Sequence, residues 1–287
     1  EFVKKVWEWK DVSGGKILNQ LKRLGSSCDW ERERFTFDEG LSAAVKHVFI
    51  KLHQDGLIYK DKRLSNWDPK LKTTISDLEV IQKEVKGNLW YIDYNIEDSD
   101  EIITVATTRP ETMLGDTGIA VHPDDERYQK YIGKNAILPI VNKKIRIVAD
   151  DYAKADQGSG AVKITPAHDF NDFEVGKRNN LEVINIFDER ACLNENVPKK
   201  YQGLDRYVVR DMIIEDLTAI NKLNKIEENE HTVPYGDRSN VVIEPWLTDQ
   251  WFVDAEKLAV EAIKKVRNKE TNFIPTNWEK TYFEWME

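Results

Sequence analysis

Residues 164–178 (ITPAHDFNDFEVGKR) place a histidine and several carboxylates directly after a Thr-Pro turn. Asp169 and Asp172 are three positions apart, so both carboxylates lie on one face of a helix that begins here. The partial positive charge of the helix N-terminus is expected to keep them ionised. Two ionised carboxylates suit an ammonium group, and Lys163 and Thr165, just upstream, suit a ligand hydroxyl. Together these residues predict a pocket for a small polar ligand at a strand end, a turn and a helix start.

Two other interpretations of this stretch stay open. Asp169 could act only as a helix N-cap, with Asp172 offering a second carboxylate to the free backbone amides. Alternatively, His168 and the two aspartates could hold a metal ion, but this spacing alone is a weak signal. The two cysteines, Cys28 and Cys192, are far apart, and no CxxC or HExxH motif occurs. We therefore expect neither a metal site nor a disulfide framework.

A second polar segment, VATTRPET (105–112), follows an apolar run that Pro110 ends. Four polar side chains lie at this strand end: Thr107, Thr108, Arg109 and Thr112. Strand ends often carry functional residues, although an ordinary strand-to-turn junction is the alternative. The segment GSGAVK (158–163) lacks the third glycine of a dinucleotide-binding motif and the Gly-Lys-Ser/Thr of a phosphate loop, so we expect no nucleotide site there.

The elements that must position these residues change in character along the chain. The first 25 residues predict two helices around a Ser-Gly-Gly break, Thr36 and Glu39 have capping-box spacing, and the helical pattern continues to about Asn66. Short β-branched and aromatic segments follow at residues 89–96, 101–109, 117–122, 136–148 and 160–165. Helices are expected again at 170–179, 206–223 and 255–266. The strands are too closely spaced for a helix between each pair. We therefore predict an α/β fold with a compact, β-barrel-like mixed sheet, surrounding helices and helical connecting arms.

Length and composition bound the class of protein. At 287 residues, 40% of them hydrophobic, the chain is large enough for about two domains. No apolar run reaches the roughly 20 residues of a membrane span and no signal peptide is evident, so we expect a cytoplasmic protein without membrane contact. The net charge of −9 argues against a long nucleic-acid groove, and any such contact should be short and local. Because Glu1 opens inside an amphipathic stretch, we expect a piece of a larger protein.

Several longer segments, in order, resemble the valyl-tRNA synthetase family. They are SCDWERERFTFDEGL, GLIYKDKRLSNWDPKLKTTISDLEV, TVATTRPETMLGDTGIAVHPDDERY, GSGAVKITPAHDFNDFEVGKR and VPYGDRSNVVIEPWLTDQWFV, and they cover nearly the whole chain. The family's ATP-site signatures, His-Ile-Gly-His and Lys-Met-Ser-Lys-Ser, do not occur. The resemblance therefore implies the inserted editing domain, which hydrolyses threonine wrongly esterified to valine tRNA. We expect this domain at residues 73–235, with connecting arms at 1–72 and 236–287.

The resemblance also implies roles for single residues, by their position in the motifs. Asp172 is expected to bind the α-ammonium of the substrate, and the side-chain hydroxyl is expected to contact Asp169, Thr165 and Lys163. The threonine-rich strand end is expected to hold the terminal adenosine and the ester. The expected catalytic residues are Asp172, Thr107, Thr108 and Lys163, and the expected substrate-binding residues are Arg109, Thr112, Thr165, Asp169 and His168. No serine or cysteine nucleophile is evident, so water is the expected attacker, and its general base is not identified.

Partners and cofactors follow from the same resemblance. The implied partner is the 3′ end of valine tRNA carrying threonine, and the chain is expected to be monomeric. No cofactor is expected in it, because ATP and Mg²⁺ would serve only the catalytic domain. One departure is Gln157, since members of the family often carry an aromatic residue at this position. Two other functions stay open: a module that binds the tRNA 3′ end without hydrolysis, and a metallohydrolase centred on His168, Asp169 and Asp172.

Overall fold

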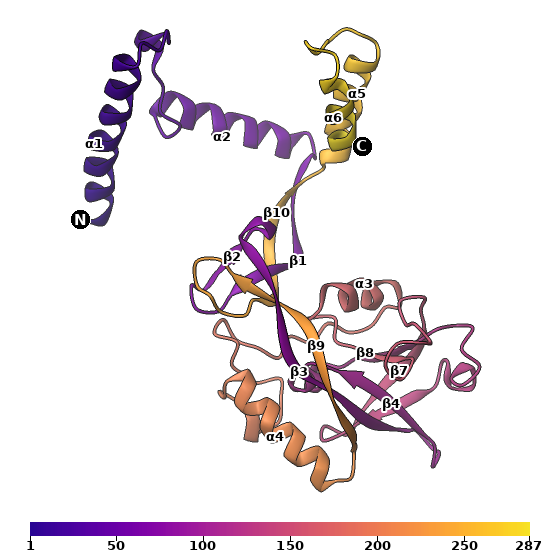
Figure 1. Cartoon of the computed structure of the whole chain (residues 1–287). Coiled ribbons are helices and arrows are strands. Elements are labelled where there is room, and N and C mark those ends of the chain that lie inside the picture. Colours follow the sequence, from indigo (N-terminus) through magenta and orange to yellow (C-terminus); the bar gives the residue numbers. More distant parts are fainter. The chain divides into compact units, whose positions relative to one another are not determined.

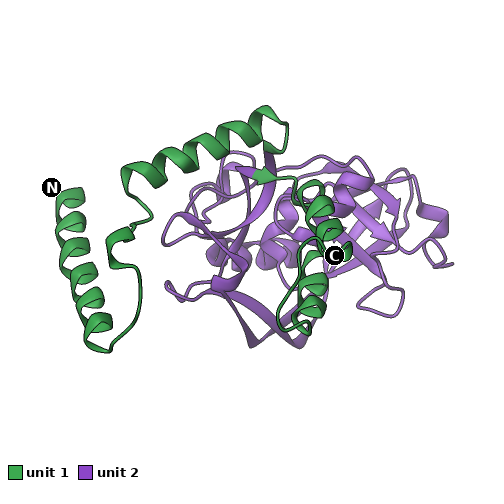
Figure 2. Cartoon of the chain, turned by 90° about the horizontal axis from the view of Figure 1, so that it is seen from above, with its two compact units in different colours: residues 1–59, 252–287 green, residues 60–251 purple.

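The chain folds into two compact units in the computed structural model, which describes residues 1–287. Unit 1 comprises residues 1–59 and 252–287, and unit 2 comprises residues 60–251 (Figure 2). Unit 2 is longer than the 73–235 expected for the editing domain because it includes most of a three-stranded sheet. The strands of that sheet are β10 (Glu244–Val253), β1 (Ile58–Asp68) and β2 (Thr73–Ile75). The functional limits at 73 and 235 stay a prediction.

Unit 1 is helical, as expected for the connecting arms. Its helices are α1 (Phe2–Arg23), α2 (Glu39–Gln54), α5 (Ala255–Arg267) and α6 (Trp278–Met286), with a 3-10 turn at Trp30–Arg32. The predicted break near the N-terminus is wrong. α1 runs through Gly14 and Gly15, since a glycine inside a helix costs only about 1 kcal/mol. The capping box at Thr36 is also wrong, because the Asp38 carboxylate caps α2 by accepting from Leu41 N at 2.8 Å.

The helical region ends earlier than the sequence predicts. α2 stops before Gly56, whose φ of +70° lets the chain turn, and β1 begins at Ile58 instead of after Asn66. β1 lies between β10 and β2, and the ring of Trp67 in β1 stacks on Trp246 in β10 at 5.5 Å. Pairing with a strand so far along the chain overrides the local helical pattern, which is all that a short sequence window contains.

Unit 2 is built on a curled sheet of seven strands (Figure 1). They are β3 (Val80–Ile96), β4 (Ile102–Thr107), β5 (Gly118–Val121), β6 (Asn135–Leu138), β7 (Lys143–Ala149), β8 (Ala161–Ile164) and β9 (Leu223–Gly236). Their order is β4-β3-β6-β7-β5-β8, with β9 paired to β3. β5 and β7 are parallel, whereas the other pairs are antiparallel. The predicted α/β fold with a curved, mixed, β-barrel-like sheet is confirmed.

Helices on this sheet enclose the core of unit 2. α4 (Arg206–Ala219) buries Val209, Ile213 and Leu217, which recur every four residues and so form one face of the helix. This face packs into the main apolar cluster with strand residues such as Ile92. A smaller cluster around Val175 fixes α3 (Phe170–Arg178) to the sheet. The end of β8 and the start of α3, which carry Lys163, Asp169 and Asp172, are therefore held on a rigid base.

Candidate functional site

A cavity of about 140 Å³ lies where β4 and β8 end and α3 begins. All nine residues proposed from the sequence line it: Thr107, Thr108, Arg109, Thr112, Lys163, Thr165, His168, Asp169 and Asp172. Ala106, Tyr152 and Val162 complete the wall. The structure thus brings two distant segments of the sequence to one place, while the roles of their residues stay predictions.

The threonine-rich turn after β4 is held by its own side chains. Pro110 starts a buried 3-10 turn, Pro110–Gly115. The Thr107 hydroxyl oxygen accepts a hydrogen bond from Arg109 N at 3.0 Å, and the Thr112 hydroxyl donates to Arg109 O at 2.9 Å. Both hydroxyls therefore stabilise the turn itself, in addition to lining the cavity. Thr108 lies half-buried between them at the cavity wall.

Lys163 uses all of its hydrogen-bond donors within the protein. Its Nζ donates to Thr112 Oγ1 at 2.9 Å, to Asp116 Oδ1 at 3.1 Å and to Thr165 Oγ1. An ammonium group has three donors, so none is left for a ligand. The Thr165 hydroxyl in turn donates to Asp116 Oδ1 at 2.6 Å. The geometry makes Lys163 and Thr165 parts of a closed polar network, which differs from the direct contact with a substrate hydroxyl that the sequence suggested.

Asp116 anchors this network and was missed in the sequence analysis. Its side chain is fully buried, and its second oxygen accepts from the Tyr94 hydroxyl at 2.8 Å. Burial raises the pKa of Asp116, while the neighbouring Lys163 opposes that shift. The available signal was a single carboxylate two residues before the apolar strand β5, at a position where burial forces an acid to find a partner.

Asp169 caps α3, as the capping interpretation proposed. Its Oδ1 accepts from Asn171 N at 2.8 Å and from Asp172 N at 3.0 Å. Asp172 does not share this task, because its Oδ2 accepts from Thr165 N, at the end of β8, at 2.9 Å. Asp169 therefore both caps α3 and lines the cavity. Its second carboxylate oxygen, Oδ2, takes no part in the two capping hydrogen bonds.

Asp172 has a pKa opposite in direction to the one expected. Burial, together with the nearby charge of Asp169, raises the pKa of Asp172 to about 7. Lys163 acts in the other direction but does not cancel this effect. The prediction that the helix N-terminus keeps Asp172 fully ionised is therefore wrong for the free chain, because a side chain only 5% exposed loses most of its hydration.

His168 is a buried wall residue and its ring is not available as a base. Nε2 accepts from Ile186 N at 2.9 Å, which places the ring proton on Nδ1. The ring packs edge-on against Phe187 at 4.6 Å, and burial, with Arg109 and Lys163 nearby, lowers the pKa of His168 well below its ordinary value. No group of three or more His, Cys, Asp or Glu side chains is arranged to hold a metal ion. His168 and the two aspartates therefore do not form the ligand set of the metallohydrolase interpretation.

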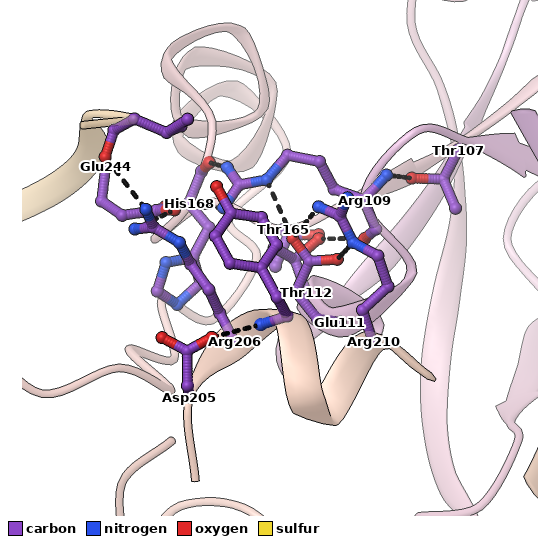
Figure 3. Close-up of polar contacts among 12 residues, drawn as sticks. Thr107, Arg109, Glu111, Thr112, Thr165, His168, Asp205, Arg206, Arg210 and Glu244 are labelled. Atoms are coloured by element: carbon purple, nitrogen blue, oxygen red, sulfur yellow. Dashed lines mark hydrogen bonds and ion pairs between the residues drawn. The ribbon is translucent and has the colours of Figure 1, made fainter. Parts of the chain in front are cut away.

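Arg109 lies at the centre of an ion-pair network (Figure 3). Its guanidinium donates to Glu244 at 2.6 Å, to His168 O at 3.1 Å and to Glu111 at 3.3 Å. Burial disfavours its charge, but the two glutamates outweigh burial and raise the pKa of Arg109. Arg109 thus joins the turn after β4 to the turn before α3 and to β10, and it holds one wall of the cavity in place.

Tyr152 is a second residue that the sequence analysis missed. It lines the cavity, and burial, with Asp169 and Asp172 nearby, raises its pKa to about 12, so its hydroxyl stays protonated at neutral pH. Gln157, by contrast, is exposed and does not line the cavity. Tyr152 therefore supplies the aromatic ring at this cavity. An aromatic residue in the acid-rich loop 149–157 was the signal available in the sequence.

The whole chain, residues 1–287, matches the family described as tRNA synthetases class I (I, L, M and V). The chain therefore belongs to this family of class I tRNA synthetases.

Its relatives within the family are valine–tRNA ligases. The chain is 60% identical to the valine–tRNA ligase of Bradyrhizobium diazoefficiens over 309 residues, which covers 100% of this chain and 32% of that protein. It is 60% identical to the enzyme of Pelagibacter ubique and 58% identical to that of Caulobacter vibrioides, over 33% and 34% of their lengths. The resemblance to the valyl-tRNA synthetase family is confirmed, and the chain spans about a third of these relatives.

Among solved structures, the chain is similar to a leucyl-tRNA synthetase from Agrobacterium radiobacter K84 in a ternary complex with tRNA and LeuAMS. The TM-score is 0.38 and the sequence identity 18%, over 78% of this chain and 36% of that one.

Proposed function

We propose that unit 2 is an editing domain that hydrolyses the aminoacyl ester of threonine attached to valine tRNA. One observation carries this proposal. The cavity has an ammonium group and two threonine hydroxyls whose donors are already used, and two carboxylates that can still accept. Such a cavity favours a ligand that brings its own donors. Threonine brings two, its α-ammonium and its hydroxyl, whereas valine brings only the ammonium.

The family makes such a step useful. Valine and threonine have nearly the same shape, and an apolar pocket shaped for valine cannot strongly reject an isostere that adds a hydroxyl. The reverse selection is easier, because acceptors left unpaired by valine cost about 1–3 kcal/mol per group.

Each residue has a proposed part in the reaction. Asp172 pairs with the α-ammonium, which favours its ionised form and overcomes the raised pKa of the free chain. The free oxygen of Asp169 accepts from the threonine hydroxyl, while Lys163 positions the oxygens of Thr112 and Thr165. Water attacks the ester carbonyl carbon, the carbonyl-to-ribose-oxygen bond breaks, and threonine and the free 3′ end of the tRNA leave.

We propose further that the reaction needs no cofactor and that the chain works as a monomer in the cytoplasm on the 3′ end of valine tRNA. None of its helices combines the length and apolarity needed to cross a membrane. Sedimentation of the purified chain at micromolar concentration tests the monomeric state.

The test of the proposed function is single-turnover deacylation of threonyl-tRNA by the chain. The expected result is release of free threonine well above the uncatalysed rate, and its loss in Asp172→Asn. Tight binding of the threonyl-tRNA without release of threonine would instead favour the module that binds the tRNA 3′ end without hydrolysis.

A further inference from the structure

The carboxylate of Asp116 lies behind one wall of the cavity. This wall, which we call the Lys163 wall, consists of the side chains of Thr112, Lys163 and Thr165. Asp116 does not line the cavity, and its side chain is fully buried. It follows the 3-10 turn Pro110–Gly115, and a hydrogen bond from Thr117 N to Ile164 O, at 3.0 Å, ties the next residue to the end of β8. The fold therefore fixes this carboxylate against the wall.

The Lys163 wall holds five hydrogen-bond donors, three on the ammonium group and one on each threonine hydroxyl. All five are used within the protein. The ammonium donates to both hydroxyl oxygens and to Asp116. The Thr165 hydroxyl donates to Asp116, and the Thr112 hydroxyl donates to Arg109 O. Each hydroxyl oxygen keeps one lone pair, because Lys163 occupies only the other. This wall can therefore accept hydrogen bonds from a ligand but cannot donate them.

Two of the five donors depend on one oxygen of Asp116. Its Oδ1 lies 3.1 Å from Lys163 Nζ and 2.6 Å from Thr165 Oγ1. Without this acceptor, each of these two groups would have a free donor, and both groups line the cavity. The second oxygen, Oδ2, accepts from the Tyr94 hydroxyl at 2.8 Å. The two oxygens of Asp116 therefore have separate partners, and only Oδ1 controls the donors of the wall.

We propose that Asp116 is a positioning residue that keeps the Lys163 wall free of donors, so that the cavity rejects aminoacyl esters whose side chain carries an acceptor but no donor. The inference rests on the proposed function, which places the amino acid in the cavity. The hydroxyl of threonine can donate to the free oxygen of Asp169, so it fits this wall. An ether oxygen at the same position has only lone pairs, and a buried acceptor that meets no donor is destabilising.

The test uses four esters of valine tRNA, whose side chains have the same number of non-hydrogen atoms. Threonine and valine differ by a hydroxyl, which both donates and accepts. O-methylserine and norvaline differ by an ether oxygen, which only accepts. The acceptor ratio is kcat/KM for the O-methylseryl ester divided by kcat/KM for the norvalyl ester. Both are measured on the same preparation, so a loss of folded protein cancels in this ratio.

Wild type should have an acceptor ratio of about one or less. Asp116→Leu, which removes the acceptor but keeps the branched shape, should raise the ratio at least about fivefold, the contribution of one ordinary hydrogen bond. Asp116→Asn should keep the wild-type ratio, because its amide oxygen can face the two donors of the wall while its NH2 group faces the Tyr94 oxygen. Tyr94→Phe is the matched control, since it removes a hydrogen bond from the same carboxylate without freeing a donor on the wall.

Two results would overturn the inference. One is an acceptor ratio clearly above one in wild type, because a donor would then reach the side chain of the ligand. The other is an unchanged ratio in Asp116→Leu. If this variant does not fold, Asp116→Leu combined with Lys163→Met replaces the buried ion pair by apolar side chains, which proteins often tolerate. The Thr165 hydroxyl is then free to donate, so the acceptor ratio should rise in this double variant as well.

A binding measurement separates this inference from the proposed function. Titration calorimetry with adenosine that carries the same four amino acids through a 3′-amide needs no hydrolysis. Wild type should bind the threonyl amide more tightly than the valyl amide, and the O-methylseryl amide no more tightly than the norvalyl amide. This pattern supports the inference even if no ester is cleaved, in which case only the proposed hydrolysis fails. Tighter binding of the O-methylseryl than of the norvalyl amide contradicts the role of Asp116 whatever the catalytic result.

Discussion

Replacing Asp172 by asparagine tests how burial controls the charge at the cavity. The side chain is 5% exposed and its pKa is about 7, against about 3.9 for an aspartate in an unfolded chain. Between these two values the folded chain holds a proton that the unfolded chain has released. Rising pH in this window therefore lowers the free energy of unfolding. Asparagine carries no such proton, and its amide oxygen can still accept from Thr165 N, which lies 2.9 Å from the carboxylate.

The size of the effect follows from the two pKa values. At about 1.4 kcal/mol per pH unit, Asp172→Asn should gain about 2–3 kcal/mol of unfolding free energy relative to wild type between pH 5 and pH 8. Deacylation activity should fall although the stability rises, because a neutral amide cannot form an ion pair with the α-ammonium of the substrate. Removing one partner of a buried charged pair costs several kcal/mol, so threonyl-tRNA deacylation should fall at least about a hundredfold.

Urea unfolding at the two pH values, followed by deacylation assays on the same preparations, measures both quantities. Asp150→Asn is the matched control. Burial would raise the pKa of Asp150, but hydrogen bonds from Arg178 and the backbone lower it, so this variant should gain no stability as pH rises. Parallel pH curves for wild type and Asp172→Asn would refute the argument from burial. Deacylation within threefold of wild type would refute the assignment to the ammonium.

Three further predictions concern the neighbouring residues and the mechanism. Asp169→Asn should keep the melting temperature of wild type, because asparagine caps a helix about as well as aspartate. It should slow threonine editing by about 5- to 150-fold, and unchanged activity would mean that Asp169 acts only as a helix cap. Lys163→Met should destabilise the chain by about 3–5 kcal/mol because it leaves the carboxylate of Asp116 buried without its cation. Adding Asp116→Asn should restore more than half of that stability without restoring deacylation, and no recovery would argue against the ion pair. Deacylation should be unaffected by EDTA, whereas loss of activity that zinc restores would support the metallohydrolase interpretation.

The sequence predicted those features of the fold that depend on local pattern. Alternating segments such as 101–109 became strands of the mixed sheet, and the stretch after Pro166 became α3 with Asp169 as its cap. β1 was mistaken for helix because its partner β10 lies almost 200 residues away, beyond any local window. Element type follows from neighbours in sequence only where tertiary pairing agrees with them.

Only part of the candidate site, likewise, could be predicted from the sequence. The nine lining residues could be named because the motifs that carry them are continuous in sequence. Asp116 and Tyr152 were not named, although Asp116 lies inside the segment TVATTRPETMLGDTGIAVHPDDERY, because the role of Asp116 follows from its buried contact with Lys163 and that of Tyr152 from the packing of its loop on the cavity. For the same reason the donors of Lys163 were expected to be free and the pKa of Asp172 low, since both depend on partners and depth that exist only after folding.

The central claim is that the cavity selects threonine by the hydroxyl that valine lacks. Its most direct test is the ratio of kcat/KM for threonyl-tRNA and valyl-tRNA deacylation, with the same valine tRNA charged with either amino acid. The two carboxylates of the cavity are proposed to accept hydrogen bonds from two donors of the ligand, and valine supplies only one of these donors. The threonyl ester should therefore be hydrolysed at least about tenfold more efficiently than the valyl ester. Equal hydrolysis of the two esters, or faster hydrolysis of the valyl ester, would contradict the account.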